Sequence, residues 1–192
     1  MKTSSFVFLA VVALMLGLAG KVNAQGACGG TVEYSNDCAG NDRKWHISCC
    51  PDGYRVQGVA YTDIKDRDAI DAISTICRKV GAMDNPPQIT GDFQKAPKKF
   101  ECNKEEVMAG IRSKDRAADD NKSDTLDSIE VACQNPKGKN LRWVYNTDAM
   151  NNGRAPREQT VLLPARIVGI ASKEKEKGTS DEKDCVTVVT KR

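Results

Sequence analysis

The sequence predicts an all-β protein made of three pseudo-symmetric repeats, folded as a β-prism or as a closed, barrel-like body. In each repeat a glycine lies eight residues after the first position, between apolar residues. A charged turn, a pair of aspartates and a final apolar stretch follow. The repeats span residues 50–77, 102–133 and 161–190. Their glycines are Gly58, Gly110 and Gly169.

Each repeat is expected to form two strands around its charged turn, because valine, isoleucine and threonine are enriched there with partial alternation. The first strands are expected at Tyr54–Tyr61, Glu106–Arg112 and Arg166–Ala171, and the second at Ala69–Cys77, Leu126–Cys133 and Cys185–Thr190. A glycine within a strand indicates a bulge or a close approach of neighbouring atoms. Its recurrence in all three repeats favours close packing.

A helix is the main alternative for residues 68–78, where Ala69, Ala72 and Ile76 fit helical spacing. The equivalent segment Cys185–Thr190 is a poor helix former, so the repeat favours strands. Between the repeats, residues 78–100 and 134–160 contain several prolines and an Asn-Asn-Gly sequence, which are typical of loops. Short strands are expected within them at Gln88–Phe93 and Leu141–Tyr145.

The cysteines follow the repeat. The first two repeats open and close with cysteine, and the third has Val161 and Thr190 at those positions. Loss of both positions together predicts a disulfide within each of the first two repeats, Cys50–Cys77 and Cys102–Cys133. Four cysteines remain, and sequence leaves their three pairings open: Cys28, Cys38, Cys49 and Cys185.

We favour Cys28–Cys49, because Trp45 lies four residues before Cys49 just as Ile73 lies four before Cys77. Residues 28–49 would then be a shortened relative of the repeat, and Cys38 would pair with Cys185.

The N-terminus predicts a secretory signal peptide over residues 1–24. Lys2 supplies a positive charge, Phe6–Leu18 is apolar, and Val22–Ala24 supplies the small residues of a cleavage site. We therefore expect a single disulfide-rich domain over residues 25–192, secreted, or periplasmic or on the cell surface in a bacterium. The apolar run is too short for a membrane span, so no membrane insertion is expected.

Charge and histidine content narrow the function classes. The formal net charge of the chain is +3, and two of its lysines lie in the predicted signal peptide. In the rest of the chain, basic residues are interleaved with acidic ones. This pattern argues against nucleic-acid binding, which needs a basic stripe. His46, the single histidine, does not suffice for a histidine-rich zinc site. We expect no cofactor and no metal. Calcium at the aspartate pairs is the alternative, against ordinary turn hydrogen bonds or ion pairs.

The candidate binding residues are the basic members of two charged turns and one tryptophan: Lys65, Arg67, Lys114, Arg116 and Trp143. Three such turns would form a ring of loops able to hold an acidic glycan or a protein, or they would be solvated hairpin tips. Trp143 is the aromatic residue best suited to stack on a sugar at the surface.

The Cys-x7-Gly unit with its acidic turn and closing cysteine resembles the vitelline-membrane outer-layer protein family, which implies a β-prism over residues 50–190. The segment Asp42–Cys50 contains an Asp-Arg-x-Trp…Cys motif that is similar to dermatopontin-like proteins of the extracellular matrix. The two resemblances imply a secreted β-repeat protein that binds glycan or matrix.

The expected function is therefore a secreted, non-catalytic protein that binds an extracellular glycan or a matrix or coat protein, in an oligomeric state that the sequence leaves open. Two alternatives remain. One is a polysaccharide hydrolase or transferase using carboxylates. The other is a structural subunit of a sheath or filament.

Overall fold

The structure is a computed structural model, and it describes residues 22–23, 28–32, 45–63, 70–82, 84–90, 98–115, 126–137, 140–144, 157–160, 166–174 and 183–191. Every regular element in these ranges is a strand. The strands are β1 (Val22–Asn23), β2 (Thr31–Val32), β3 (His46–Cys49), β4 (Tyr54–Asp63), β5 (Ile70–Lys79), β6 (Gln88–Thr90), β7 (Lys98–Glu101), β8 (Val107–Asp115), β9 (Leu126–Gln134), β10 (Leu141–Val144), β11 (Arg157–Thr160), β12 (Arg166–Glu174) and β13 (Lys183–Lys191).

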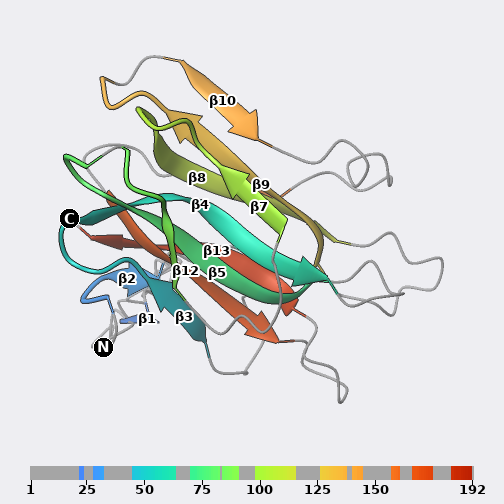
Figure 1. The fold of residues 1–192 in the computed structure, drawn as a ribbon. Helices are drawn as coiled ribbons and strands as arrows, with labels where there is room; N and C mark the ends of the chain where they lie inside the picture. The colour runs from blue at the N-terminus through green and yellow to red at the C-terminus, as the bar shows by residue number, and fades with distance from the viewer. Residues whose placement is uncertain are drawn as a thin grey trace, which may run out of the picture.

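The strands form three antiparallel sheets, and each repeat supplies the long central hairpin of one (Figure 1). The first repeat builds the sheet β6-β5-β4-β7, and the second builds β10-β9-β8-β11. The third repeat builds β1-β2-β13-β12-β3, in which the N-terminal strands flank the C-terminal hairpin. The predicted all-β fold with three repeats is confirmed, and its form is a β-prism.

All three hairpins share one register, including two irregularities. Near the start of the first strand, the pairing skips Gln57, Ala109 or Val168, directly before the repeat glycine. Near the start of the second strand, it skips Asp71, Asp127 or Asp184. An unpaired extra residue in one strand is a β-bulge, which bends the strand and turns its backbone groups outward. The recurrent aspartates therefore occupy a recurrent bulge.

The bulge before each glycine binds the next stretch of chain. The carbonyl of Gln57 accepts a hydrogen bond from the N–H of Cys102 at 2.8 Å, and that of Val168 accepts one from Cys50 at 3.0 Å. The strand that ends at the cysteine then lies directly on the glycine. A Cβ on Gly58 would collide with the carbonyl oxygen of Phe100, and one on Gly169 would lie 2.5 Å from that of Ser48. Close packing and a bulge, the two expectations for this position, both occur.

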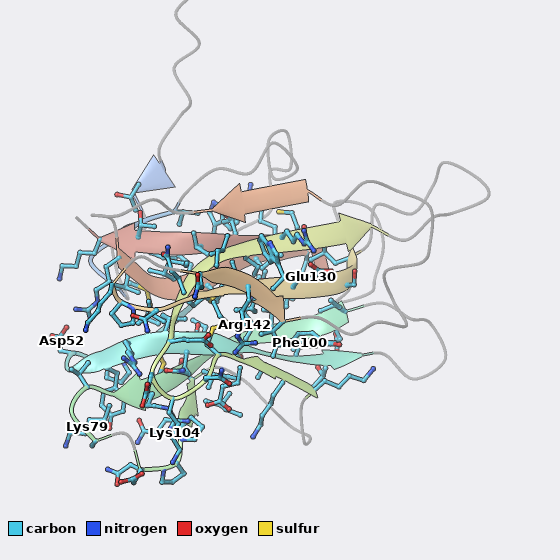
Figure 2. All side chains as sticks on the ribbon, turned by 90° about the horizontal axis from the view of Figure 1, so that it is seen from above. Asp52, Lys79, Phe100, Lys104, Glu130 and Arg142 are labelled. Atoms are coloured by element: carbon cyan, nitrogen blue, oxygen red, sulfur yellow. A yellow bond between two sulfur atoms is a disulfide. The ribbon has the colours of Figure 1, made fainter. Side chains whose placement is uncertain are left out.

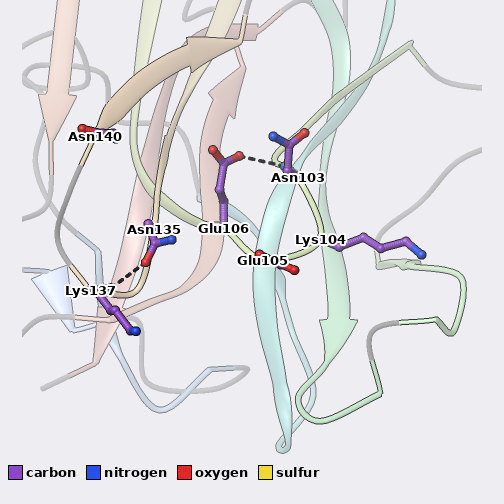
Figure 3. A pocket seen from close by; sticks show the side chains of 7 residues that line it. All are labelled: Asn103, Lys104, Glu105, Glu106, Asn135, Lys137 and Asn140. Carbon is purple, nitrogen blue, oxygen red and sulfur yellow. Dashed lines mark hydrogen bonds between the residues drawn. The ribbon is translucent and has the colours of Figure 1, made fainter.

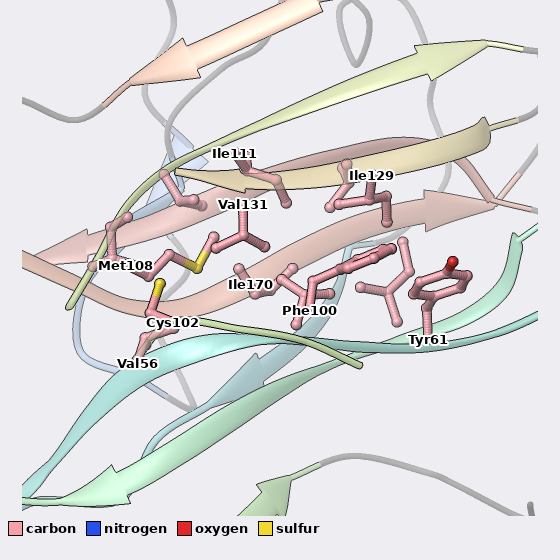
Figure 4. Close-up of a cluster of buried hydrophobic side chains, with 14 of the residues drawn as sticks. Val56, Tyr61, Phe100, Cys102, Met108, Ile111, Ile129, Val131 and Ile170 are labelled. Carbon is pink, nitrogen blue, oxygen red and sulfur yellow. The ribbon is translucent and has the colours of Figure 1, made fainter. Parts of the chain in front are cut away.

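The core fills the space between the three sheets (Figure 4). Each sheet contributes branched residues from alternate positions of its two long strands, with Tyr61 and Phe100 stacked at 5.3 Å between ring centroids. A second, smaller cluster joins Val32, Val168, Ala171 and Val189, with Trp45 packed against it. Few aromatic residues are needed because the β-branched residues of three sheets meet at one axis.

Two disulfides lie where the chain passes from one sheet to the next. Cys50 follows β3 of the third repeat's sheet and is bonded to Cys77 of β5, and Cys102 follows β7 and is bonded to Cys133 of β9. Cys28 is bonded to Cys49. These three bonds join the predicted partners. Cys185 is also disulfide-bonded, and Cys38, its predicted partner, lies outside the described residues.

One sequence interpretation is wrong. Residues 28–49 are not a shortened hairpin repeat, because β2 pairs with β13 while β3 pairs with β12 on the other side of the sheet. These two strands are flanking strands, equivalent to β6 and β7 in the first repeat's sheet. The predicted disulfide Cys28–Cys49 is present although the analogy behind it fails, because the bond links the edge strand β3 to the bend before β2 rather than the two ends of one hairpin.

Candidate functional site

The Cys102 turn, residues 102–106, is held rigidly from three directions. The disulfide to Cys133 ties its first residue to β9. The side-chain amide of Gln57, which is fully buried, donates to the carbonyls of Cys102 at 2.9 Å, of Glu106 at 3.1 Å and of Asn103. Arg55 donates to the carbonyl of Lys104. Because these bonds fix the backbone, the outward side chains of the turn project from a preorganised frame.

A pocket of about 720 Å³ lies on the outer side of this turn, between it and the turn that joins β9 to β10 (Figure 3). Its lining is entirely polar or charged: Asn103, Lys104, Glu105, Glu106, Asn135, Lys137 and Asn140. The Cys102–Cys133 disulfide lies at the base of both turns and sets their spacing.

Glu106 is the most strongly held carboxylate of the pocket. Arg142 of β10 donates its Nε to Oε1 at 2.9 Å and its Nη2 to Oε2 at 2.5 Å, and the N–H of Asn103 donates to Oε2 at 2.9 Å. The hydrogen bond from Arg142 is the main reason that the pKa of Glu106 lies below its ordinary value, and the same bond raises the pKa of Arg142. Glu106 is therefore a fixed anion at neutral pH.

The opposite wall of the pocket is a turn with its own internal constraints. The N–H of Lys137 donates to the side-chain oxygen of Asn135 at 3.0 Å. Asn140 has a φ of 65°, the left-handed conformation that asparagine tolerates better than most residues. Few other residue types with a side chain would adopt this backbone conformation at the wall of the pocket.

Such a lining suits ligands rich in hydroxyl groups. Carboxylates and amide oxygens accept hydrogen bonds, amides and ammonium groups donate them, and each hydroxyl both donates and accepts. Within the described ranges, no three His, Cys, Asp or Glu side chains gather in a way that could hold a metal ion. In the same ranges, no helix is long and apolar enough to cross a membrane.

Of the binding residues predicted from sequence, only Lys114 and Trp143 fall within the described ranges, and neither lines this pocket. Lys65, Arg67 and Arg116 lie outside the described residues, and Lys114 is on β8 with its side chain undescribed. In the sequence, Lys65, Arg67 and Arg116 fall between the two long strands of the first and second repeats. The acidic-glycan ring at the charged turns stays a prediction.

Trp143 of β10 is half-buried, and the guanidinium of Arg112 lies over its ring, 4.2 Å from the centroid. Arg112 also pairs with Glu130, which is 1% exposed. Trp143 is next in sequence to Arg142, which holds Glu106. The predicted aromatic residue thus lies beside the pocket's framework rather than in its lining, and its role in binding stays a prediction.

His46 lies on the edge strand β3, and its Nε2 is 2.8 Å from Oε1 of Glu174. The pocket residues themselves were missed by sequence reasoning. Gln57 and Glu106 carry no motif, and only their positions relative to the repeat, at the bulge and four residues after the cysteine, could have indicated them.

No protein family matches the chain in sequence, and no curated protein is similar to it in sequence. Among solved structures, the agglutinin of Calystegia sepium is similar, with a TM-score of 0.50 and 14% identity over 84% of this chain and 96% of that chain. The Calsepa lectin in complex with a biantennary N-glycan has a TM-score of 0.51, with 14% identity over the same shares. Both are β-prism lectins, and neither is a vitelline-membrane outer-layer protein or a dermatopontin-like protein. What this chain shares with them is the β-prism fold.

Proposed function

We propose that this chain is a secreted, non-catalytic glycan-binding protein, acting in an extracellular matrix or coat, and that it binds glycan hydroxyls in the pocket beside Glu106. The observation that carries the proposal is the preorganised polar pocket. Its two walls are joined by a disulfide, and its carboxylate is already fixed by Arg142. Binding sites of this kind lose little conformational entropy when the ligand arrives.

Two further observations support the proposal. Similar β-prism structures are lectins, one of them crystallised with a glycan. Three described disulfides in a chain that begins with a predicted signal peptide agree with an oxidising, extracellular location. The resemblance of the repeats to vitelline-membrane outer-layer and dermatopontin-like proteins favours a role in a coat or matrix, and the sheath or filament subunit remains the structural alternative.

The test is a glycan array probed with residues 25–192, containing neutral, amino and acidic glycans. The double variant Lys137→Ser with Asn140→Gly removes two lining side chains and keeps a residue that accepts the φ of 65° at position 140. We expect the retained glycan to bind at least about tenfold more weakly, as when polar partners are lost from a site. The melting temperature should stay unchanged. Lys99→Ser, on the exposed part of β7, is the matched control.

A second variant tests the charged turns predicted from the sequence. Serine at Lys65, Arg67, Lys114 and Arg116 should abolish retention of sulfated or uronic-acid polysaccharides if the charged turns bind them, and that binding should weaken with salt. Retention of no glycan by the unmodified protein would refute the proposed function. Turnover of any glycan in a parallel assay would favour the hydrolase or transferase.

A further inference from the structure

A second cavity, of about 440 Å³, lies beside the Cys50 turn, residues 50–54. It is bounded by that turn, by both ends of the third repeat's hairpin and by Cys28. Its lining residues are Cys28, Cys50, Pro51, Asp52, Gly53, Tyr54, Arg166, Val168 and Lys191. Asp52 lies at the end of the molecule, near Lys79 (Figure 2).

The repeat shows what fills the equivalent position one unit further along. The Cys102 turn corresponds to the Cys50 turn, and in both the carbonyl of the second residue accepts the N–H of the fifth. At the Cys102 turn, the bulge residue is Gln57, whose carboxamide enters the space beneath the turn and donates to three of its carbonyls. The carboxamide oxygen accepts from Nε of Arg55 at 3.3 Å.

At the Cys50 turn, the bulge residue is Val168, which has no amide. The arginine is kept, because Arg166 precedes Gly169 by three residues just as Arg55 precedes Gly58. Arg166 donates Nη2 to the carbonyl of Tyr54 at 2.9 Å, and Pro51 accepts from the N–H of Tyr54 at 3.0 Å. In the described part of the chain, no donor reaches the third carbonyl, that of Cys50. The cavity therefore lies where the carboxamide of Gln57 lies at the Cys102 turn, with one of the three carbonyls taken by Arg166 and that of Cys50 left for a ligand.

We propose that this cavity binds the acetamido group of an N-acetylated amino sugar. A secondary amide has one N–H, and one turn carbonyl, that of Cys50, awaits a donor. The amide oxygen takes the place of the Gln57 side-chain oxygen and accepts from the guanidinium of Arg166. The methyl group packs on Val168, which is 8% exposed. The three parts of the acetamido group each meet a matching partner.

The remaining lining residues favour a sugar over an acetylated peptide as the carrier of this group. Tyr54 offers a ring face on which a pyranose can stack. Asp52 and Lys191 supply an acceptor and a donor for ring hydroxyls at the mouth of the cavity. An extended peptide would need a row of backbone partners, and a single turn does not supply one.

The experiment measures binding of chitotriose, its fully deacetylated form and cellotriose to residues 25–192 by calorimetry. We expect chitotriose to bind at least about tenfold more tightly than the other two, because they leave the carbonyl of Cys50 or the guanidinium of Arg166 unpaired. Equal affinity for the three sugars would overturn the proposal. So would binding of an acetyl-lysine peptide without binding of chitotriose.

Val168→Gln supplies the missing carboxamide from within the chain. It should reproduce the arrangement of Gln57, abolish chitotriose binding and leave the melting temperature unchanged or higher. Arg166→Met, at an exposed position, tests the same cavity without altering the buried bulge, and it should also weaken chitotriose binding by about tenfold or more. Full binding by either variant would overturn the proposal.

This cavity and the pocket beside Glu106 are separate sites, so their tests separate as well. Lys137→Ser with Asn140→Gly should leave chitotriose binding intact. If that double variant loses chitotriose while Val168→Gln keeps it, the acetamido sugar belongs to the first pocket and the second site does not exist. If chitotriose binds as expected while no other glycan is retained, the second site stands and the first does not.

Discussion

At the scale of single residues, position within the repeat matters more than residue type. Thr75 faces the core where the equivalent residues of the other hairpins are Val131 and Val188, since all three pair with the residue directly after the repeat glycine. The equivalent bulge of each hairpin holds a different side chain: Gln57, Ala109 or Val168. What is common to the three repeats builds the prism, and what differs gives each turn its own chemistry.

The repeat glycine is the residue whose replacement should cost most. Gly58→Ala should destabilise the protein by at least about 3 kcal/mol, because the added Cβ meets the backbone oxygen of Phe100 and the β4–β7 pairing must separate. Urea denaturation measures the loss. Gly53→Ala is the control: its φ is 79° but nothing lies within 4 Å, so backbone strain alone should cost about 1–2 kcal/mol. Equal losses would show that the Gly58 position is open.

At the scale of elements, each unit is a hairpin that cannot bury its apolar face alone. The strands that flank it come from the segments between the repeats, as β6 and β7 do for the first sheet. Their sequences are short and partly polar, and β7, Lys98–Glu101, was not expected as a strand at all. It pairs with β4 because the bulged strand presents its backbone there, which is a tertiary cause.

The disulfides Cys50–Cys77 and Cys102–Cys133 each join two sheets, and each should stabilise a different binding site. Replacing Cys102 and Cys133 by serine should lower the free energy of unfolding by roughly 3–4 kcal/mol, as expected for a loop of this size in the chain-entropy model. It should also weaken ligand binding beside Glu106. Replacing Cys50 and Cys77 should instead weaken chitotriose binding. Identical binding losses in the two variants would indicate general loosening of the fold, and equilibrium unfolding with the glycan assays decides between these outcomes.

At the scale of the whole molecule, the prism closes because β3, from the N-terminal part, joins the sheet built by the C-terminal repeat. The seam between that sheet and the first repeat's sheet is polar. Thr75 donates Oγ1 to the carbonyl of Ser48 at 2.7 Å, and the N–H of Thr75 donates to Oγ of Ser48 at 3.0 Å. Ser48 also reaches Thr90 of β6.

This seam predicts a local effect on closure. Thr75→Val makes the position equal to Val131 and Val188, yet it should destabilise by about 1–3 kcal/mol, because the buried carbonyl of Ser48 loses the hydrogen bond from Oγ1 of Thr75. Hydrogen exchange should show β3 opening more often while β8 and β9 stay protected. Ser48→Ala removes the other bond, in which Oγ of Ser48 accepts from the N–H of Thr75, and it should show the same local opening. Unchanged stability and exchange in both variants would mean that apolar packing closes the prism.

The sequence by itself determined the repeat, the all-β class, the six long strands and the partners of Cys50 and Cys102. These properties are local or periodic, so they can be recognised in the sequence, and the pattern occurs in three copies that support one another. The sequence also indicated the flanking strands β6 and β10, through the short strands expected at Gln88–Phe93 and Leu141–Tyr145. The flanking strand β7, the closure of the sheet by β3 and the two pockets were decided only by the tertiary structure. Each pocket arises where a cysteine turn lies beside a segment distant in sequence, and whether Gln57 or Val168 lies beneath that turn matters only once the fold has brought the turn over it. The contact between a bulge residue and the turn above it leaves no recognisable spacing in the sequence.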